Sequence, residues 1–142
     1  MSLALGQIVA RLEDPEVPVI WLDPITPEDI WSDLPAALSA RGLAVLDLDG
    51  GQPVFYHNSL LARFSEVLPP AAGPLTTLSQ LKERLLRLPH RTSRGWVVMF
   101  HKPEALRQND EETFEDFLEV LTSVHESQNA SQHRIFKLVV RD

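Results

Sequence analysis

Few residues of this chain have the types and spacings that catalysis or metal binding requires. The 142 residues include five histidines, and none lies three or four residues from another, so no local metal-binding pair is present. There is no cysteine, which excludes thiol nucleophiles, disulfides and zinc–thiolate sites. The sequence has neither a glycine-rich phosphate loop nor a nucleophile elbow. We therefore expect no catalytic residue, no metal and no cofactor, and we predict that the protein is not an enzyme.

Two residues could still serve a small ligand. His101 follows the apolar run Trp96–Phe100, and Asp49 follows the run Leu43–Leu48. Ligands of open parallel sheets bind at the carboxyl ends of the strands, where both residues would lie if these runs are strands. The ordinary alternatives are a partly exposed histidine at a strand end and an aspartate that forms a turn. A small α/β ligand-binding protein or enzyme that uses this end of the sheet is thus an alternative function.

Acidic residues gather near the beginning of one predicted helix, and they are Asp110, Glu111, Glu112, Glu115, Asp116 and Glu119. The helix dipole favours negative charge at a helix N-terminus, which accounts for the first three. The other three make one side of the helix strongly negative. This side is either a solvated surface or a surface that binds a partner, and both interpretations stay open here.

Three short apolar runs indicate the elements that position these residues: Leu43–Leu48, Trp96–Phe100 and Ile135–Val140. Apolar runs without alternation are typical of strands that are buried on both faces, as in a parallel sheet covered by helices. Helical patterns separate the runs, which favours strand–helix–strand units with right-handed crossovers. We predict an α/β fold in which the three strands are parallel and Trp96–Phe100 is central.

Residues 1–42 contain a further strand–helix unit. Its predicted elements are, in order, a helix at Gln7–Glu13, a strand at Val19–Leu22 and a helix at Thr26–Gly42. We expect a kink or a break at Pro35, because proline removes a hydrogen bond inside a helix. An apolar strand and its helix are buried best at the edge of an existing sheet. We therefore predict a fourth strand beside Leu43–Leu48.

The remaining segments are predicted to be helices and loops. The predicted elements are a helix at Asn58–Leu68, a loop at Pro69–Pro74, a helix at Thr77–Leu88, and a helix from Asn109 to about Ser127 followed by a polar loop to His133. The helix Thr77–Leu88 has leucines at spacings of three and four, so one of its faces is apolar. We expect it to bury Leu78, Leu81 and Leu85 and to expose Lys82 and Glu83.

The composition narrows the class of partner. The chain has a formal net charge of −7, with 44% hydrophobic and 23% charged residues, which is typical of a folded globular protein. The excess of acid disfavours nucleic acid and favours basic partners or simple solubility. No apolar run approaches the roughly 18 residues of a membrane-spanning helix, and the N-terminus lacks the pattern of a signal peptide. We expect a cytoplasmic protein that contacts no membrane.

The order of motifs from Leu43 to Asp142 resembles the barstar family of ribonuclease inhibitors. The segment VLDLDG at 45–50 is similar to the family's first strand and turn, and LTTLSQLKERL at 75–85 is similar to its leucine-rich helix. An apolar strand, a helix and a C-terminal strand follow in the family's order. The resemblance implies a bacterial protein with a barstar-like fold over residues 43–142, a three-stranded parallel sheet covered by helices. Residues 1–42 would be an N-terminal extension.

The same resemblance implies a function. Members of the barstar family are not enzymes, and they plug the basic active site of a ribonuclease with acidic side chains. The corresponding residues here are Gly73, Ser79, Lys82, Glu83 and Ser123. Ser79 replaces the family's first acid and Lys82 replaces its aromatic residue, so Glu83 keeps the acidic group. The expected function is a protein-binding module of the ribonuclease-inhibitor or toxin-immunity type, whose partner is a basic ribonuclease or another basic protein.

Overall fold

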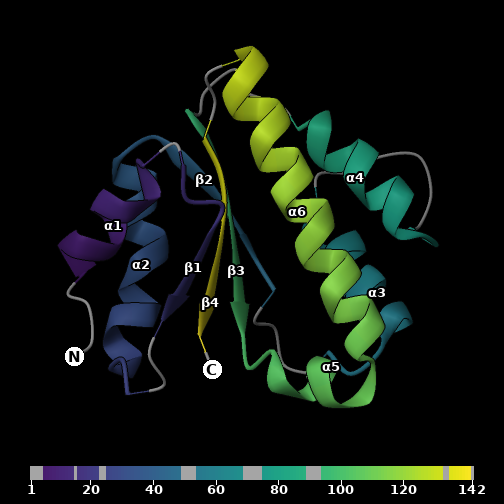
Figure 1. Cartoon of the computed structure of the whole chain (residues 1–142). Coiled ribbons are helices and arrows are strands. Elements are labelled where there is room, and N and C mark those ends of the chain that lie inside the picture. Colours follow the sequence, from purple (N-terminus) through teal and green to yellow (C-terminus); the bar gives the residue numbers. More distant parts are fainter. Residues whose placement is uncertain are drawn as a thin grey trace.

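The computed structural model describes residues 5–14, 16–22, 25–48, 54–68, 75–88, 94–132 and 135–141. The strands in these ranges are β1 (Val19–Leu22), β2 (Leu43–Asp47), β3 (Gly95–His101) and β4 (Ile135–Arg141). The helices are α1 (Leu5–Leu12), α2 (Glu28–Ala40), α3 (His57–Val67), α4 (Leu78–Leu86), α5 (Glu104–Asn109) and α6 (Glu111–Gln132). Helices cover both faces of the sheet, so the elements form three layers (Figure 1).

The sheet is parallel, and β3 lies between β2 and β4, as predicted. The strand order is β1-β4-β3-β2, and every neighbouring pair is parallel. Val97, Val98 and Met99 of β3 are completely buried, because helices cover both faces of this strand. The prediction of an α/β fold with a parallel sheet built around Trp96–Phe100 is therefore confirmed.

The N-terminal strand joins this sheet, as predicted, but at the opposite edge. β1 pairs with β4, with Val19 opposite Leu138 and Leu22 opposite Arg141, and not with β2. The reason is that α2 covers the face opposite to α3, α4, α5 and α6. A right-handed crossover over one face runs against the direction of crossovers over the other. β2, β3 and β4 follow one another across the sheet in one direction, so the connection from β1 to β2, which passes over the other face, must run across the sheet in the opposite direction. β1 therefore lies beyond β4.

Side chains that alternate along the strands form two hydrophobic cores. The core on the α2 side contains the helix residues Ile8, Val9, Leu12, Trp31, Leu34 and Leu38. The core on the α6 side is larger, and Phe117 lies at its centre with its ring 5.7 Å from those of Phe64 and Phe100. Each fully buried large side chain contributes about 1.5–3 kcal/mol, so the two cores fix the three layers.

Two glycines are required by local geometry. Gly42 ends the segment after α2 in the left-handed conformation, with φ at 78°, as predicted for a helix C-terminus. Gly95 begins β3 where the backbone of β4 comes very close. A Cβ atom at this position would lie 2.1 Å from the carbonyl oxygen of Ile135, so no larger residue fits without moving a strand.

Two helices differ from their predictions, α2 at its internal proline and α3 at its first residue. We predicted a kink or a break at Pro35, and the break is absent, because α2 runs from Glu28 to Ala40 with Pro35 inside it. An internal proline costs about 3 kcal/mol, and burial of Trp31 and Leu34 on the same helix offsets this cost. α3 begins at His57 rather than Asn58, because the side chain of Ser59 closes its first turn on the backbone.

α6 begins and ends at residues other than those predicted. Asp110, not Asn109, caps it: its Oδ1 accepts from the amide of Thr113 at 3.3 Å and its Oδ2 from the hydroxyl of Thr113 at 2.9 Å. At its other end α6 continues through the segment that was predicted as a loop after Ser127. Gln128 is buried there, and its Nε2 donates to the carbonyl of Leu86 at 3.4 Å. Packing against α4 therefore keeps this polar segment helical.

Candidate functional site

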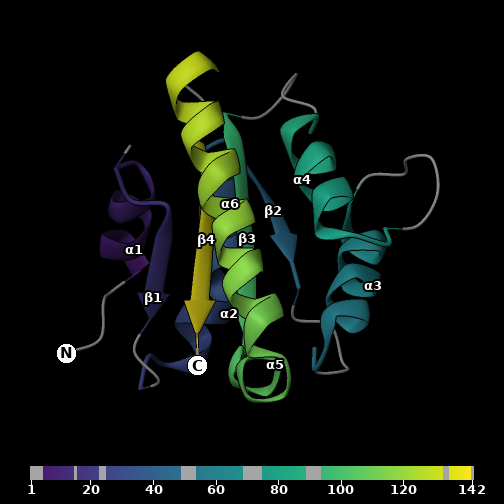
Figure 2. The same ribbon diagram turned by 45° about the vertical axis from the view of Figure 1, so that its right-hand side comes forward.

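The helix that the barstar resemblance selects, α4, is positioned by its cap and two leucines. The hydroxyl of Thr77 accepts from the amide of Gln80 at 3.1 Å, which starts the helix. Leu81 and Leu85 are buried, as predicted, but Leu78 is only partly buried. α4 lies beside α6 in the same layer (Figures 1 and 2). The helix thus presents its remaining faces at the surface of this layer.

The predicted partner-binding residues differ in exposure. Ser79 and Glu83 are exposed on α4, whereas Lys82 and Ser123 are partly buried. Lys82 was predicted to be exposed, but its side chain is partly buried. Lys82 lies one turn after Leu78, and both residues occupy the border between the buried and exposed faces of α4. Gly73 lies outside the described residues.

α6 carries a row of acidic side chains on its outer face, which we call the acidic ridge. The ridge consists of Glu112, Asp116, Glu119 and Glu126, with Ser123 on the same line. These positions follow one another at spacings of four and three, so they share one side of the helix. All four carboxylates are exposed, and none forms an ion pair with a cation in the part of the chain that the structure describes. A negative surface of this kind attracts basic partners.

The N-terminus of the acidic helix is fixed to the N-terminus of α3. Besides capping α6, Asp110 Oδ2 accepts from the backbone amide of His57 at 3.2 Å. The hydrogen bond from the Thr113 side chain is the main cause that lowers the pKa of Asp110 below its ordinary value of 3.8, and the His57 amide adds to it. The carboxylate of Asp110 therefore stays ionised and holds the N-terminus of α6 beside that of α3.

The carboxyl end of the sheet holds a second group of polar residues, which we call the Arg141 cluster. It consists of Arg141, His101, Glu28, Thr26 and Trp31. Arg141 at the end of β4 pairs in register with His101 at the end of β3. Its Nη1 lies 2.9 Å from His101 Nε2 and 3.1 Å from Glu28 Oε2, and its Nη2 donates to the carbonyl of Thr26 at 2.9 Å.

Sequence reasoning selected His101 for this end of the sheet but missed its neighbours. Asp49, the other selected residue, lies outside the described residues, and Asp47 is exposed at the end of β2. Arg141 was not selected from the sequence, where it directly follows the apolar run Ile135–Val140. The available signal was that two parallel strands end in His101 and Arg141, which places both at one end of the sheet.

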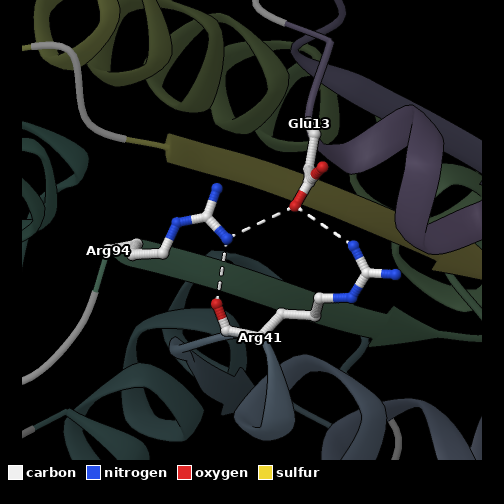
Figure 3. A network of polar contacts seen from close by, with 3 residues as sticks. All are labelled: Glu13, Arg41 and Arg94. Carbon is white, nitrogen blue, oxygen red and sulfur yellow. Dashed lines mark hydrogen bonds and ion pairs between the residues drawn. The ribbon is translucent and has the colours of Figure 1, made fainter.

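The amino end of the sheet carries a different polar network, shown in Figure 3. Glu13 Oε1 lies 3.5 Å from Arg41 Nη1 and 3.3 Å from Arg94 Nη1, and Arg94 Nη1 also donates to the carbonyl of Arg41 at 3.0 Å. The side chains of Glu13, Arg41 and Arg94 are 36%, 52% and 53% exposed. The network links the ends of α1 and α2 to the start of β3, but exposed pairs of this kind stabilise weakly.

One lysine is buried between the two ends of the sheet. Lys137 in β4 is 2% exposed, and its Nζ donates to the carbonyls of Asp14 and Val17 in the connection between α1 and β1. Burial lowers the pKa of Lys137 to about 8, and the carboxylate of Asp14 opposes this effect. Its bonds to two carbonyls give it a structural role.

Among the described residues, no group of three or more histidine, aspartate or glutamate side chains could hold a metal ion. The helices within the described ranges also include none that is long and apolar enough to cross a membrane. Comparison with models of protein families finds no family that matches this chain, and comparison with curated proteins finds no significant relative. The likeness to the barstar family therefore stays a prediction from motif order.

Proposed function

We propose that the protein is a non-enzymatic protein-binding module that holds a basic partner, such as a ribonuclease or a similarly charged toxin, against the outer surface of α4 and α6. The observation that carries this proposal is the acidic ridge, since its four carboxylates are exposed and have no ion-pair partner among the described residues. The net charge of −7 adds long-range attraction for a basic protein.

Within this surface α6 carries more of the attraction than α4. Glu83 on α4 is exposed, but Arg87 on the same helix is exposed too, and Lys82 and Arg84 are partly exposed. These cations would meet a cationic partner and weaken its binding. A complex centred on the acidic ridge, with Glu83 at its margin, avoids most of this repulsion.

The test is binding and inhibition of a panel of small basic microbial ribonucleases, measured by calorimetry and by RNA cleavage. The first variant combines Asp116→Asn with Glu119→Gln, and we expect it to bind at least about 30-fold more weakly, the equivalent of about 2 kcal/mol for a desolvated interface charge. The matched control combines Asp33→Asn with Glu16→Gln, which removes two exposed charges outside the acidic ridge. This control should change the affinity by less than about threefold, through long-range attraction alone.

Two results contradict the proposal. One is the absence of binding to every ribonuclease of the panel at micromolar concentration. The other is an equal loss of affinity in the ridge variant and in its control, since the attraction would then be non-specific. Glu83→Gln refines the site: an effect larger than that of the ridge variant moves the centre of the interface to α4, as the barstar resemblance implies.

A further inference from the structure

We propose that the Arg141 cluster is a binding site for a small oxyanion, a carboxylate or a phosphate group, held by the guanidinium of Arg141 and the hydroxyl of Thr26. Nothing in the protein-binding proposal requires this site, because the acidic ridge lies on α6 and the cluster lies on the α2 side of the sheet. The anion site and the protein-binding surface are therefore separate proposals, and each can fail without the other.

The first argument is that two buried polar atoms lack partners at this point. Thr26 is 2% exposed and Arg141 is 8% exposed. Neither Thr26 Oγ1 nor Arg141 Nε has a hydrogen-bond partner among the described residues, although the backbone carbonyl of Thr26 accepts from Arg141 Nη2. A buried donor left unpaired costs about 1–3 kcal/mol. An oxyanion can accept from both atoms, and the positive charge of the guanidinium favours an anion over a water molecule.

The second argument concerns charge. A guanidinium only donates hydrogen bonds, so in this contact His101 Nε2 is the acceptor. The ring of Trp31, 5.6 Å from that of His101, packs against this imidazole. Arg141 therefore provides the positive charge in the interior of the cluster, while His101 orients it.

Glu28 shows how a carboxylate reaches the arginine. Its Oε2 lies 3.1 Å from Arg141 Nη1, but its side chain is 72% exposed, against 9% for that of Arg141. An exposed carboxylate gains little from such a pair and can rotate into water at small cost. A ligand carboxylate or phosphate would take its place, so Glu28 acts as an internal competitor of the ligand.

The third argument is the position of the cluster in the fold. The chain leaves β1 towards α2 on one face of the sheet and leaves β3 towards α5 and α6 on the other. β4 lies between β1 and β3, and Arg141 ends it. Open parallel sheets bind ligands where connections diverge in this way at the carboxyl ends of the strands.

The experiment measures thermal unfolding and NMR shifts of the whole chain in sodium phosphate, sodium acetate and sodium chloride at equal pH and ionic strength. We expect phosphate or acetate to raise the melting temperature progressively above that in chloride, by mass action on the folded state. The two anions separate the sources, because a phosphate site responds to the first and a carboxylate site to the second. The Nε–H resonance of Arg141 should shift with the same midpoint.

Two variants keep the buried arginine and so keep the fold. Thr26→Val should leave the melting temperature in chloride unchanged or raised, since it removes an unpaired hydroxyl, but should weaken anion binding about tenfold. Glu28→Gln should tighten anion binding, since it removes the competing charge. Arg94→Gln alters an arginine at the opposite end of the sheet and should bind the anion as the parent does.

Three results overturn the proposal. The melting temperatures in phosphate and acetate follow that in chloride; Thr26→Val binds the anion as well as the parent; or Arg94→Gln abolishes the effect. In the first case the unpaired atoms share a water molecule, and in the third the anion binds at the amino end.

Discussion

At the amino end of the sheet Glu13 joins two arginines whose side chains are about half exposed, whereas at the carboxyl end Glu28 joins an arginine whose side chain is 9% exposed. The residue types are the same, but the surroundings are not. At the amino end the two arginines contact one carboxylate oxygen, and all three side chains are exposed (Figure 3). At the carboxyl end the arginine also contacts His101 and the carbonyl of Thr26.

The difference shows that burial, rather than the number of ion pairs, decides what a polar cluster can do. The exposed network can be broken at little cost, because water replaces each lost contact. The guanidinium of Arg141 cannot be removed as cheaply, because the buried groups that it contacts would lose their hydrogen-bond donor. For the same reason the buried cluster has unsatisfied atoms that can select a ligand, while the exposed network does not.

The largest expected effect comes from the backbone at the amino end. Gly95→Ala places a Cβ 2.1 Å from the carbonyl oxygen of Ile135, so β3 and β4 must separate. We expect a loss of about 3 kcal/mol or more in the free energy of unfolding, at or above the upper limit for overpacking. Urea unfolding measures it. Gly6→Ala is the control, since a Cβ there has nothing within 4 Å. Equal stabilities of Gly95→Ala and the parent would contradict the close approach of the two strands.

The next effect tests the carboxyl end directly. Arg141→Met removes the guanidinium and leaves the carbonyl of Thr26 and the imidazole of His101 without their donor. We expect a loss of about 2–3 kcal/mol, somewhat below the range for fully buried pairs because Glu28 is exposed. Urea unfolding again gives the value, and Arg41→Met is the matched control at the amino end. If both variants lose the same amount, burial does not distinguish the two ends.

The sequence predicted the sheet better than the polar clusters, for physical reasons. Apolar runs bracketed by turns define strands locally, so β2, β3 and β4 could be found without knowing their neighbours. The edge that β1 joins depends on which face α2 covers, and the pattern of α2 alone does not contain this information. If α2 had been assigned to the face of the sheet that the later helices leave free, the handedness of the crossover would have placed β1 beside β4.

The candidate site depended even more on tertiary structure. His101 and Arg141 are forty positions apart, and only the register between β3 and β4 brings them together. Thr26 follows β1 and reaches Arg141 because β1 pairs with β4. The sequence had predicted β1 at the other edge of the sheet. Glu83 is exposed on α4, as predicted, whereas the border position of Lys82 depends on packing that a helical repeat does not resolve.

A smaller, pH-dependent effect lies between the two ends, at Lys137. Its pKa is lowered from the ordinary 10.5 to about 8, so from pH 8 to 10.5 the unfolded chain holds a proton that the folded chain has released. Lys137 therefore makes stability rise with pH in this window, and below pH 8 the folded state bears a buried charge. Lys137→Met should lose this rise in urea unfolding at pH 7.5 to 10, while Lys102→Met, at an exposed lysine, should keep it. A rise that persists in Lys137→Met would assign it to another group.

The smallest expected effect is at the exposed network of the amino end. Glu13→Gln breaks both ion pairs of the network, but the three side chains are 36–53% exposed and gain hydration in exchange. We expect a loss of less than about 1 kcal/mol at low salt, and almost none in 1 M sodium chloride, where the Debye length is about 3 Å. Glu16→Gln is the matched control, because Glu16 is an exposed acid nearby whose side chain has no ion pair among the described residues. A larger loss in Glu13→Gln that survives 1 M salt would mean that Arg41 and Arg94 depend on Glu13 as strongly as Arg141 depends on its buried partners. The contrast between the two ends would then lie in geometry rather than in exposure to water.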